Sequence, residues 1–218
     1  MKTIKGYLAF TSFVYRIAMF GMLPLALVAV DIWAAAFMGD DVRVLLAAMP
    51  FVMIMVEILA DTWMFGGIQG KAAARIDFLK TSPKGMGLLQ KALIMDLVRR
   101  FLSFSGIMAA CVLVNLAWGV EMFGGDPVKG LGVILSLILS SYAVSVLCII
   151  LARFATMLWQ SVLAGYLGLA VESVYVGLLI VLGHPFVWCC VCAVLAVGAS
   201  VLAVKIAMKK VRGGYYDR

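Results

Sequence analysis

The chain has 218 residues, of which 65% are hydrophobic and 13% are charged, and its formal net charge is +7. Soluble domains average about 45–50% apolar and about 25% charged residues, so this composition excludes a water-soluble globular protein. The cations flank apolar segments and form no separate basic stripe, so we attribute them to membrane topology and anionic lipid and expect no nucleic-acid partner. We therefore expect an all-α integral membrane protein in a lipid bilayer, with a single transmembrane domain over residues 1–218.

Six apolar segments have about the length that a helix needs to cross the hydrocarbon core. Backbone groups in lipid must satisfy their own hydrogen bonds, and the alternating pattern of barrel strands is absent, so each segment is predicted to be a transmembrane helix. The first fifteen residues are apolar and aromatic but too short to span, which predicts a short amphipathic N-terminal helix along the membrane surface. The predicted spans are residues 17–38, 44–66, 101–120, 131–152, 158–182 and 186–208.

The distribution of positive charge predicts that both termini are cytoplasmic. Of the 18 lysines and arginines, all but Arg43 and Lys129 lie before the first span, at or beyond the end of the last, or between spans two and three or four and five. Lysine and arginine favour the cytoplasmic side of a membrane. We therefore expect a multi-pass protein of the plasma membrane, of bacterial type, with its N- and C-termini inside.

The connection between the second and third spans is the longest polar stretch of the chain. It contains a short predicted helix over 72–80 that ends before Pro83, because proline disfavours helix at the residue that precedes it. Ile76, Phe78 and Leu79 place apolar side chains among the cations of this helix. Two surfaces would cover such an apolar tip: the groove of a partner protein or the membrane itself. The residues alone leave both open.

The run Asp77-Phe78-Leu79-Lys80-Thr81-Ser82-Pro83-Lys84, followed by a helix that enters the membrane, resembles the coupling-helix region of ABC transporter permeases of the type-2 exporter class. The chain is also similar to those permeases in its six spans, cytoplasmic ends, amphipathic N-terminal helix and main cytoplasmic loop between spans two and three. The resemblance implies that a separate ATPase subunit docks on the loop and that a second permease subunit, the same or homologous, pairs with this one. The implied docking residues are Arg75, Ile76, Asp77, Phe78, Leu79, Lys80, Pro83 and Lys84.

The chain departs from these permeases in one respect, because they usually carry re-entrant helices between spans five and six. Here the only obvious break is Gly183-His184-Pro185, and a small re-entrant segment would have to come from part of residues 174–192. ATP and magnesium are expected only in the partner ATPase, and no cofactor in this chain. Its nearest approach to a phosphate-binding loop, Phe65–Ala72, lacks the first glycine and the magnesium-binding Ser or Thr. No nucleophile–base pair or metal cluster is apparent, so we do not expect an enzyme.

Five charged residues are predicted to meet inside the membrane. Glu57 and Asp61 lie four residues apart on one face of the second span. An uncompensated acid at the bilayer centre costs about 2.5–3.5 kcal/mol on insertion scales, so each should have a partner. Arg99 and Arg100 enter the membrane at similar depth on the next helix, and Asp96 lies one turn before them. The cluster either anchors the loop between the two spans or relays its motion into the membrane.

Glu172 lies in the outer half of the fifth span near Tyr175, with no cation close in sequence. The two residues mark either a transport path or a subunit seam at which Glu172 is a neutral, hydrogen-bonded acid. Gly165 and Gly168 of the same span are read as close-packing positions. Asp31, near the outer end of the first span, is expected to reach water.

We expect the chain to be the membrane-spanning half of an ATP-driven exporter. One alternative is the substrate-capturing membrane subunit of a vitamin importer, although the outer loops predicted here are short. The other is a non-transporting membrane protein, such as an immunity or assembly factor. A neighbouring gene for an ATPase would distinguish this last class from the first.

Overall fold

The computed structural model of the chain describes residues 7–8, 11–38, 42–65, 82, 84–120, 126–153 and 158–212. Within these ranges 93% of the residues are helical and no strand is present, so the predicted all-α class is confirmed. The elements are α2 (Phe13–Ile17), the π-helical turn η1 (Ala18–Met22), α3 (Leu23–Met38), α4 (Val42–Phe65), α6 (Gly85–Ala117), α7 (Pro127–Ala152), α8 (Leu158–Leu182) and α9 (Pro185–Arg212).

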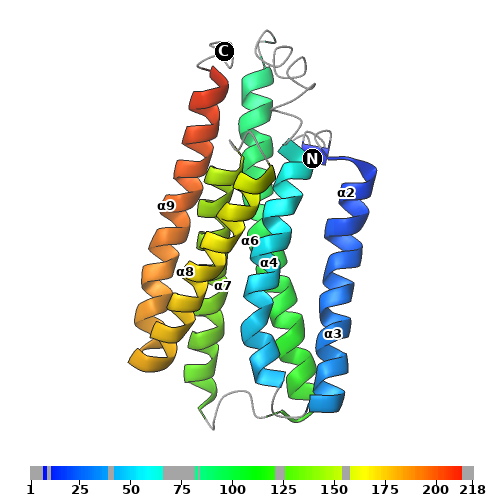
Figure 1. Ribbon diagram of the computed structural model, residues 1–218, viewed down its shortest axis with the longest axis vertical. Coiled ribbons are helices and arrows are strands. Elements are labelled where there is room, and N and C mark those ends of the chain that lie inside the picture. Colours follow the sequence, from blue (N-terminus) through cyan, green and yellow to red (C-terminus); the bar gives the residue numbers. More distant parts are fainter. Residues whose placement is uncertain are drawn as a thin grey trace.

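Five helices in the described part of the chain are long and apolar enough to cross a membrane. They are 13–38, α6, α7, 159–182 and α9. α4, with 24 residues, runs beside them and corresponds to the second predicted span (Figure 1). The helix bounds agree with the predicted spans to within a few residues, except that α6 begins at Gly85, so that the predicted third span is only the C-terminal part of this helix. A helix of 33 residues is about 50 Å long, so α6 extends well beyond one bilayer crossing.

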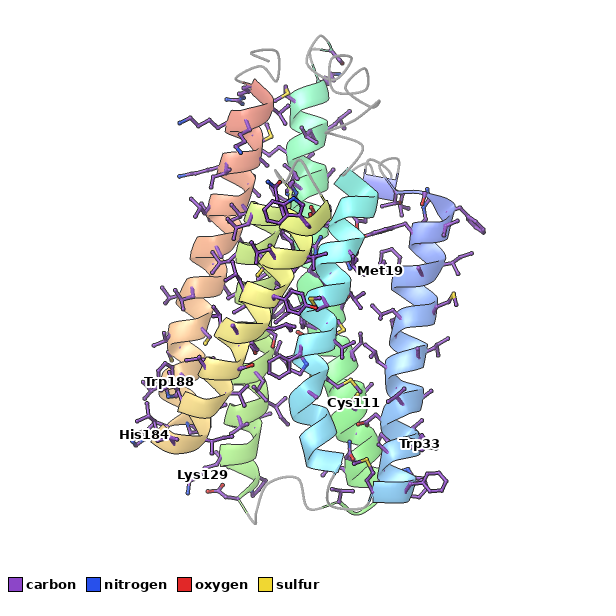
Figure 2. The ribbon with its side chains drawn as sticks, viewed as in Figure 1. Met19, Trp33, Cys111, Lys129, His184 and Trp188 are labelled. Carbon is purple, nitrogen blue, oxygen red and sulfur yellow. The ribbon has the colours of Figure 1, made fainter. Side chains whose placement is uncertain are left out.

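Successive long helices run antiparallel, so that α4, α7 and α9 end where α2, α6 and α8 begin (Figure 1). We call this the C-terminal end of the bundle. Trp33, Lys129 and His184 lie at the opposite end (Figure 2). α7 is the central helix: 72% of its most apolar window is buried, against 22–39% for the other four candidate spans. The core therefore forms around α7, and α9 contributes the small side chains Ala196, Ala199 and Ala203 to it.

Two glycines of α8 allow close packing against α4 and α7. A Cβ at Gly168 would lie 2.6 Å from Cys148 Sγ, and one at Gly165 would lie 2.6 Å from Met55 Sδ. Real Cβ atoms do not approach other atoms so closely, so a larger residue requires a neighbour to move. The predicted packing role of both glycines is therefore confirmed, and α8 is held against the rest of the bundle by backbone approach.

The connection from α8 to α9 consists of Gly183 and His184 alone. Gly183 has φ 62°, a left-handed conformation that glycine adopts without steric cost. His184 is exposed at this turn. The turn holds no re-entrant helix, because α8 continues to Leu182 and α9 begins at Pro185.

The segment before the first span folds back onto the bundle. Ser12 caps α2 by accepting a hydrogen bond from the Tyr15 amide at 3.1 Å. The Arg16 guanidinium donates to the Leu8 carbonyl at 2.7 Å. Tyr7 is helical and only 3% exposed, because its ring packs against protein. The described part of the N-terminal segment is therefore attached to the helices, and its position along the membrane surface stays a prediction.

Candidate functional site

Arg100 of α6 is the centre of a buried ion-pair network toward the C-terminal end of the bundle. Its Nε donates to Asp96 Oδ2 at 2.8 Å, and its Nη2 donates to Asp61 Oδ1 at 3.0 Å. Its Nη1 donates to Glu57 Oε2 at 2.7 Å and to the Glu57 carbonyl at 2.9 Å. The side chain has no exposed surface. A planar guanidinium with five fixed donors suits such a site, where one cation must serve three carboxylates.

Arg99 binds the same two helices from the neighbouring position. Its Nη1 and Nη2 donate to the two Glu57 carboxylate oxygens at 2.9 and 2.5 Å, and its Nε donates to Asp96 Oδ1 at 3.3 Å. The paired contact with Glu57 is the bidentate geometry in which charge-assisted hydrogen bonds are strongest. The structure thus brings together all five residues that the sequence analysis grouped, and their spacing by one helical turn within each helix accounts for it.

Arg153 is a sixth member of the network. The sequence placed it in the connection between the fourth and fifth predicted spans. It follows the last residue of α7, and its guanidinium lies 2.5 Å from Asp61 Oδ1 and 3.7 Å from Asp96 Oδ2. The signal that could have found it is its position directly after an apolar span on the predicted cytoplasmic side, where a cation reaches the same depth as Asp61. Three carboxylates thus face three guanidinium groups, and the network is formally neutral.

A tyrosine from the N-terminal segment completes the network. Tyr7 Oη donates to Asp96 Oδ1 at 3.4 Å and lies 3.5 Å from Tyr15 Oη. The Arg99 guanidinium carbon lies 6.0 Å from the centre of the Tyr15 ring, at the limit of a cation–π contact. Burial raises the pKa of the Tyr7 phenol, and the nearby Asp96 charge raises it further. Tyr7 therefore remains a neutral donor that ties the start of the chain to α6.

The network holds α4, α6 and α7 together at one level of the bundle. None of the buried carboxylate or guanidinium atoms of Glu57, Asp61, Asp96 or Arg100 lacks a hydrogen-bond partner. Removal of one partner from a buried pair typically costs about 3–5 kcal/mol, because a charge is left uncompensated in a medium of low dielectric constant. The arrangement leaves no free nucleophile or base, and so it is suited to a rigid connection between helices.

Most of the predicted ATPase-docking residues lie outside the described residues: Arg75, Ile76, Asp77, Phe78, Leu79, Lys80 and Pro83. Ser82 and Lys84 are described. The Gly85 amide donates to the Ser82 carbonyl at 3.0 Å, and Lys84 is exposed directly before α6. Residues 66–84 connect α4, which ends at Phe65, to α6, which begins at Gly85, and both of these helices belong to the ion-pair network.

Glu172 forms a second buried polar group, between α8 and α7. Its Oε1 accepts from Ser140 Oγ and Ser141 Oγ, each at 2.8 Å. Among the residues that the structure describes, neither its Oε2 nor the nearby Tyr175 Oη has a hydrogen-bond partner, and the carboxylate has no exposed surface. The Tyr175 ring packs edge to face on Trp188 of α9, with ring centres 5.9 Å apart. Glu172 and Tyr175 therefore contact other helices of the same chain.

Asp31 does not reach water, contrary to the expectation from the sequence. It has no exposed surface and its Oδ2 accepts from Asn115 Nδ2 at 2.9 Å. Asn115 Nδ2 also donates to the Cys111 carbonyl at 2.8 Å. The partner lies in α6, so the sequence gives no local signal for it. Oδ1 of Asp31 and Oδ1 of Asn115 have no partner among the described residues.

Comparison of the chain with models of protein families, with curated proteins and with solved structures finds no match.

Proposed function

We propose that the chain is the permease subunit of an ATP-driven exporter, with six transmembrane helices and with the C-terminal end of the bundle in the cytoplasm. α4 would be the second span. The exposed Lys205, Lys209 and Arg212 at this end favour the cytoplasmic orientation, because lysine and arginine concentrate there. Trp33 at the opposite end is 61% exposed, as expected of a ring at a membrane–water interface.

The observation that carries the proposal is the ion-pair network that joins α4 to α6, the two helices that residues 66–84 connect. Any force on these residues acts on the end of α4 and the start of α6. Arg100 clamps these two helices together, and Arg153 adds α7 through Asp61. A loop anchored in this way transmits displacement to three helices at once, which is the property that a docking loop for an ATPase requires.

The rest of the bundle supplies a route for that displacement. α7 packs along both α8 and α9, and α8 meets α4 and α7 at Gly165 and Gly168. Glu172, hydrogen-bonded to two serines of α7, lies where a rotation of α8 against α7 changes the surroundings of a buried acid. Rigid-body motion of packed helices around a fixed polar group is a known basis of alternating access. The proposed path therefore follows the seam between α7 and α8.

The test is purification of the tagged chain from its native membranes in gentle detergent. We expect an ATP-hydrolysing subunit to copurify in stoichiometric amount. Phe78→Ala should release it, because interfaces concentrate their energy in a few apolar or aromatic anchors. Leu88→Ala is the matched control: it shortens an exposed apolar side chain of α6 outside the loop and should leave the ATPase bound.

An undiminished share of ATPase with Phe78→Ala would refute the assignment of the docking loop. Wild-type protein without any ATPase would refute the exporter proposal and favour a non-transporting membrane protein. The importer alternative requires a substrate site open to the outside, and the two-residue connection between α8 and α9 provides no outer cover for one.

A further inference from the structure

A groove of about 680 Å³ opens to the side of the bundle between α6 and α9, and α7 forms its floor. Its walls are apolar: Val98 and Leu102 of α6 face Val197 and Val201 of α9, and all four are 45–66% exposed. On the floor, Tyr142 Oη lies 2.8 Å from Ser200 Oγ, which itself donates to a backbone carbonyl. These hydroxyls satisfy each other, so the groove offers an apolar surface to whatever occupies it.

The mouth of the groove, toward the C-terminal end, is cationic. A second hollow, of about 520 Å³, shares Gln90 and Lys205 with the groove and adds Lys209 and Arg212. The three cations are exposed, and within the described part of the chain none of them forms an ion pair with an acid. A positively charged mouth therefore leads into an apolar trough on the surface that faces lipid.

We propose that this groove binds a phospholipid with an anionic headgroup from the leaflet at the C-terminal end. Lys205, Lys209 and Arg212 would hold the phosphate, and one acyl chain would lie along the trough. Ala193 and Lys205 are twelve residues apart in sequence, which corresponds to about 18 Å along the helix. One leaflet contributes about 15 Å of hydrocarbon, so the trough has the length of one lipid chain.

Charge favours this occupant over a second copy of the chain. Most homodimers have twofold symmetry, in which a surface patch meets its own copy. A twofold contact centred on this groove would bring Lys205, Lys209 and Arg212 of one copy against the same cations of the other. An anionic lipid instead supplies the missing negative charge, at about 1 kcal/mol for each lysine or arginine near the surface. The inference does not depend on the proposed exporter function.

Native mass spectrometry of the full chain in detergent tests the inference, with dioleoyl phosphatidylglycerol and dioleoyl phosphatidylcholine as probes. The two lipids share their acyl chains and differ in headgroup charge. We expect one phosphatidylglycerol to bind with at least tenfold preference. Lys205→Ala with Lys209→Ala should weaken its binding by about 30-fold, from two lost charge contacts. Val197→Trp should block the trough and weaken binding without any change of charge.

The matched control is Lys84→Ala with Lys91→Ala, which removes the same charge from two exposed lysines outside the groove, one directly before α6 and one within it. It should leave phosphatidylglycerol binding within about twofold of wild type. If both double variants lose the same share of phosphatidylglycerol binding, the lipid is attracted by net charge alone, and the proposed site would be overturned. Equal binding of the two lipids, or unchanged binding with Val197→Trp, would overturn it as well. The site would also be overturned if the wild-type chain formed a dimer that Val197→Trp dissociates while lipid binding stays constant. Thermal unfolding of each variant checks that it is folded.

Discussion

The Arg153 guanidinium, at the end of α7, lies 2.5 Å from Asp61 Oδ1, in the last turns of α4. Arg100 of α6 reaches the same oxygen at 3.0 Å. Asp61 is thus the carboxylate at which three helices meet, and two of its cationic partners are distant from it in sequence. Without Asp61, both guanidinium groups would compete for Glu57 and Asp96, and α7 would lose its shortest ionic contact with α4.

A double-mutant cycle on Asp61 and Arg153 should show this coupling. Asp61→Asn alone leaves Arg100 and Arg153 with one carboxylate partner fewer and the network with an excess positive charge, and it should destabilise the protein by about 3–5 kcal/mol. Arg153→Gln alone should cost less, because Asp61 keeps Arg100. The double variant should recover part of the loss, with a coupling energy of about 0.5–3 kcal/mol.

The measurement is denaturant-induced unfolding in mixed micelles. Asp126→Asn is the control, because this acid lies at the surface and pairs with Lys129 at 3.3 Å in solvent. Strict additivity of the two single changes would refute a direct role for Arg153 in the network.

Gly168 should tolerate alanine only when Cys148 is shortened. An added Cβ would lie 2.6 Å from Cys148 Sγ, and such overpacking typically costs about 1–3 kcal/mol. Cys148→Ala removes the obstructing sulfur, so the double variant should be more stable than Gly168→Ala alone. Gly177→Ala, in the same helix with no atom within 4 Å of the new Cβ, should be neutral or slightly stabilising. Thermal unfolding compares the three; equal effects at Gly168 and Gly177 would contradict the close packing of α8.

The orientation of the bundle can be tested with single cysteines in a cysteine-free background. A cysteine at His184, in the exposed turn between α8 and α9, should react with an impermeant maleimide added to intact cells. One at Lys84, exposed before α6, should react only after permeabilisation, because the cations of that end favour the cytoplasm. Labelling at Lys84 in intact cells would reverse the proposed topology.

The helices and the charge cluster could be predicted because each depends on local or periodic signals. Span length follows from bilayer thickness, and the pairing of Glu57 and Asp61 with Arg99 and Arg100 follows from spacing along adjacent helices. The position of Arg153 directly after an apolar span indicates its depth, but its pairing with Asp61 also depends on how α7 packs against α4, so depth alone does not identify the partner. Such packing between apolar helices leaves little trace in composition.

Asp31 illustrates the same limit at the opposite end. Its position near the end of the span suggested contact with water. Its hydrogen-bond donor, Asn115, lies on α6, and the sequence does not show that α6 packs against this part of α3. The overall hydrophobicity of a transmembrane helix does not indicate which face meets lipid and which meets protein. For the same reason the groove between α6 and α9 had no signal in the sequence, although the cations at its mouth were counted for topology.

The last prediction applies one chemical change to two buried glutamates. Glu57→Gln replaces a carboxylate that accepts hydrogen bonds from Arg99 and Arg100, so it leaves two buried cations short of negative charge. It should destabilise the protein by about 3–5 kcal/mol. Glu172 contacts no cation among the described residues, and its Oε1 accepts only from two serine hydroxyls. The glutamine amide keeps that acceptor oxygen, so Glu172→Gln should change stability by no more than about 1 kcal/mol.

Unfolding of both variants in the same micelles measures the difference directly. Glu57→Asp is an informative companion, because it keeps the charge and shortens the side chain; its stability should lie between those of wild type and Glu57→Gln. A loss with Glu172→Gln as large as that with Glu57→Gln would mean that Glu172 has a charged partner. If Glu57→Gln leaves stability unchanged, Asp96 and Asp61 are sufficient to hold Arg99 and Arg100. The ionic contact between α4 and α6 would then depend on Asp61.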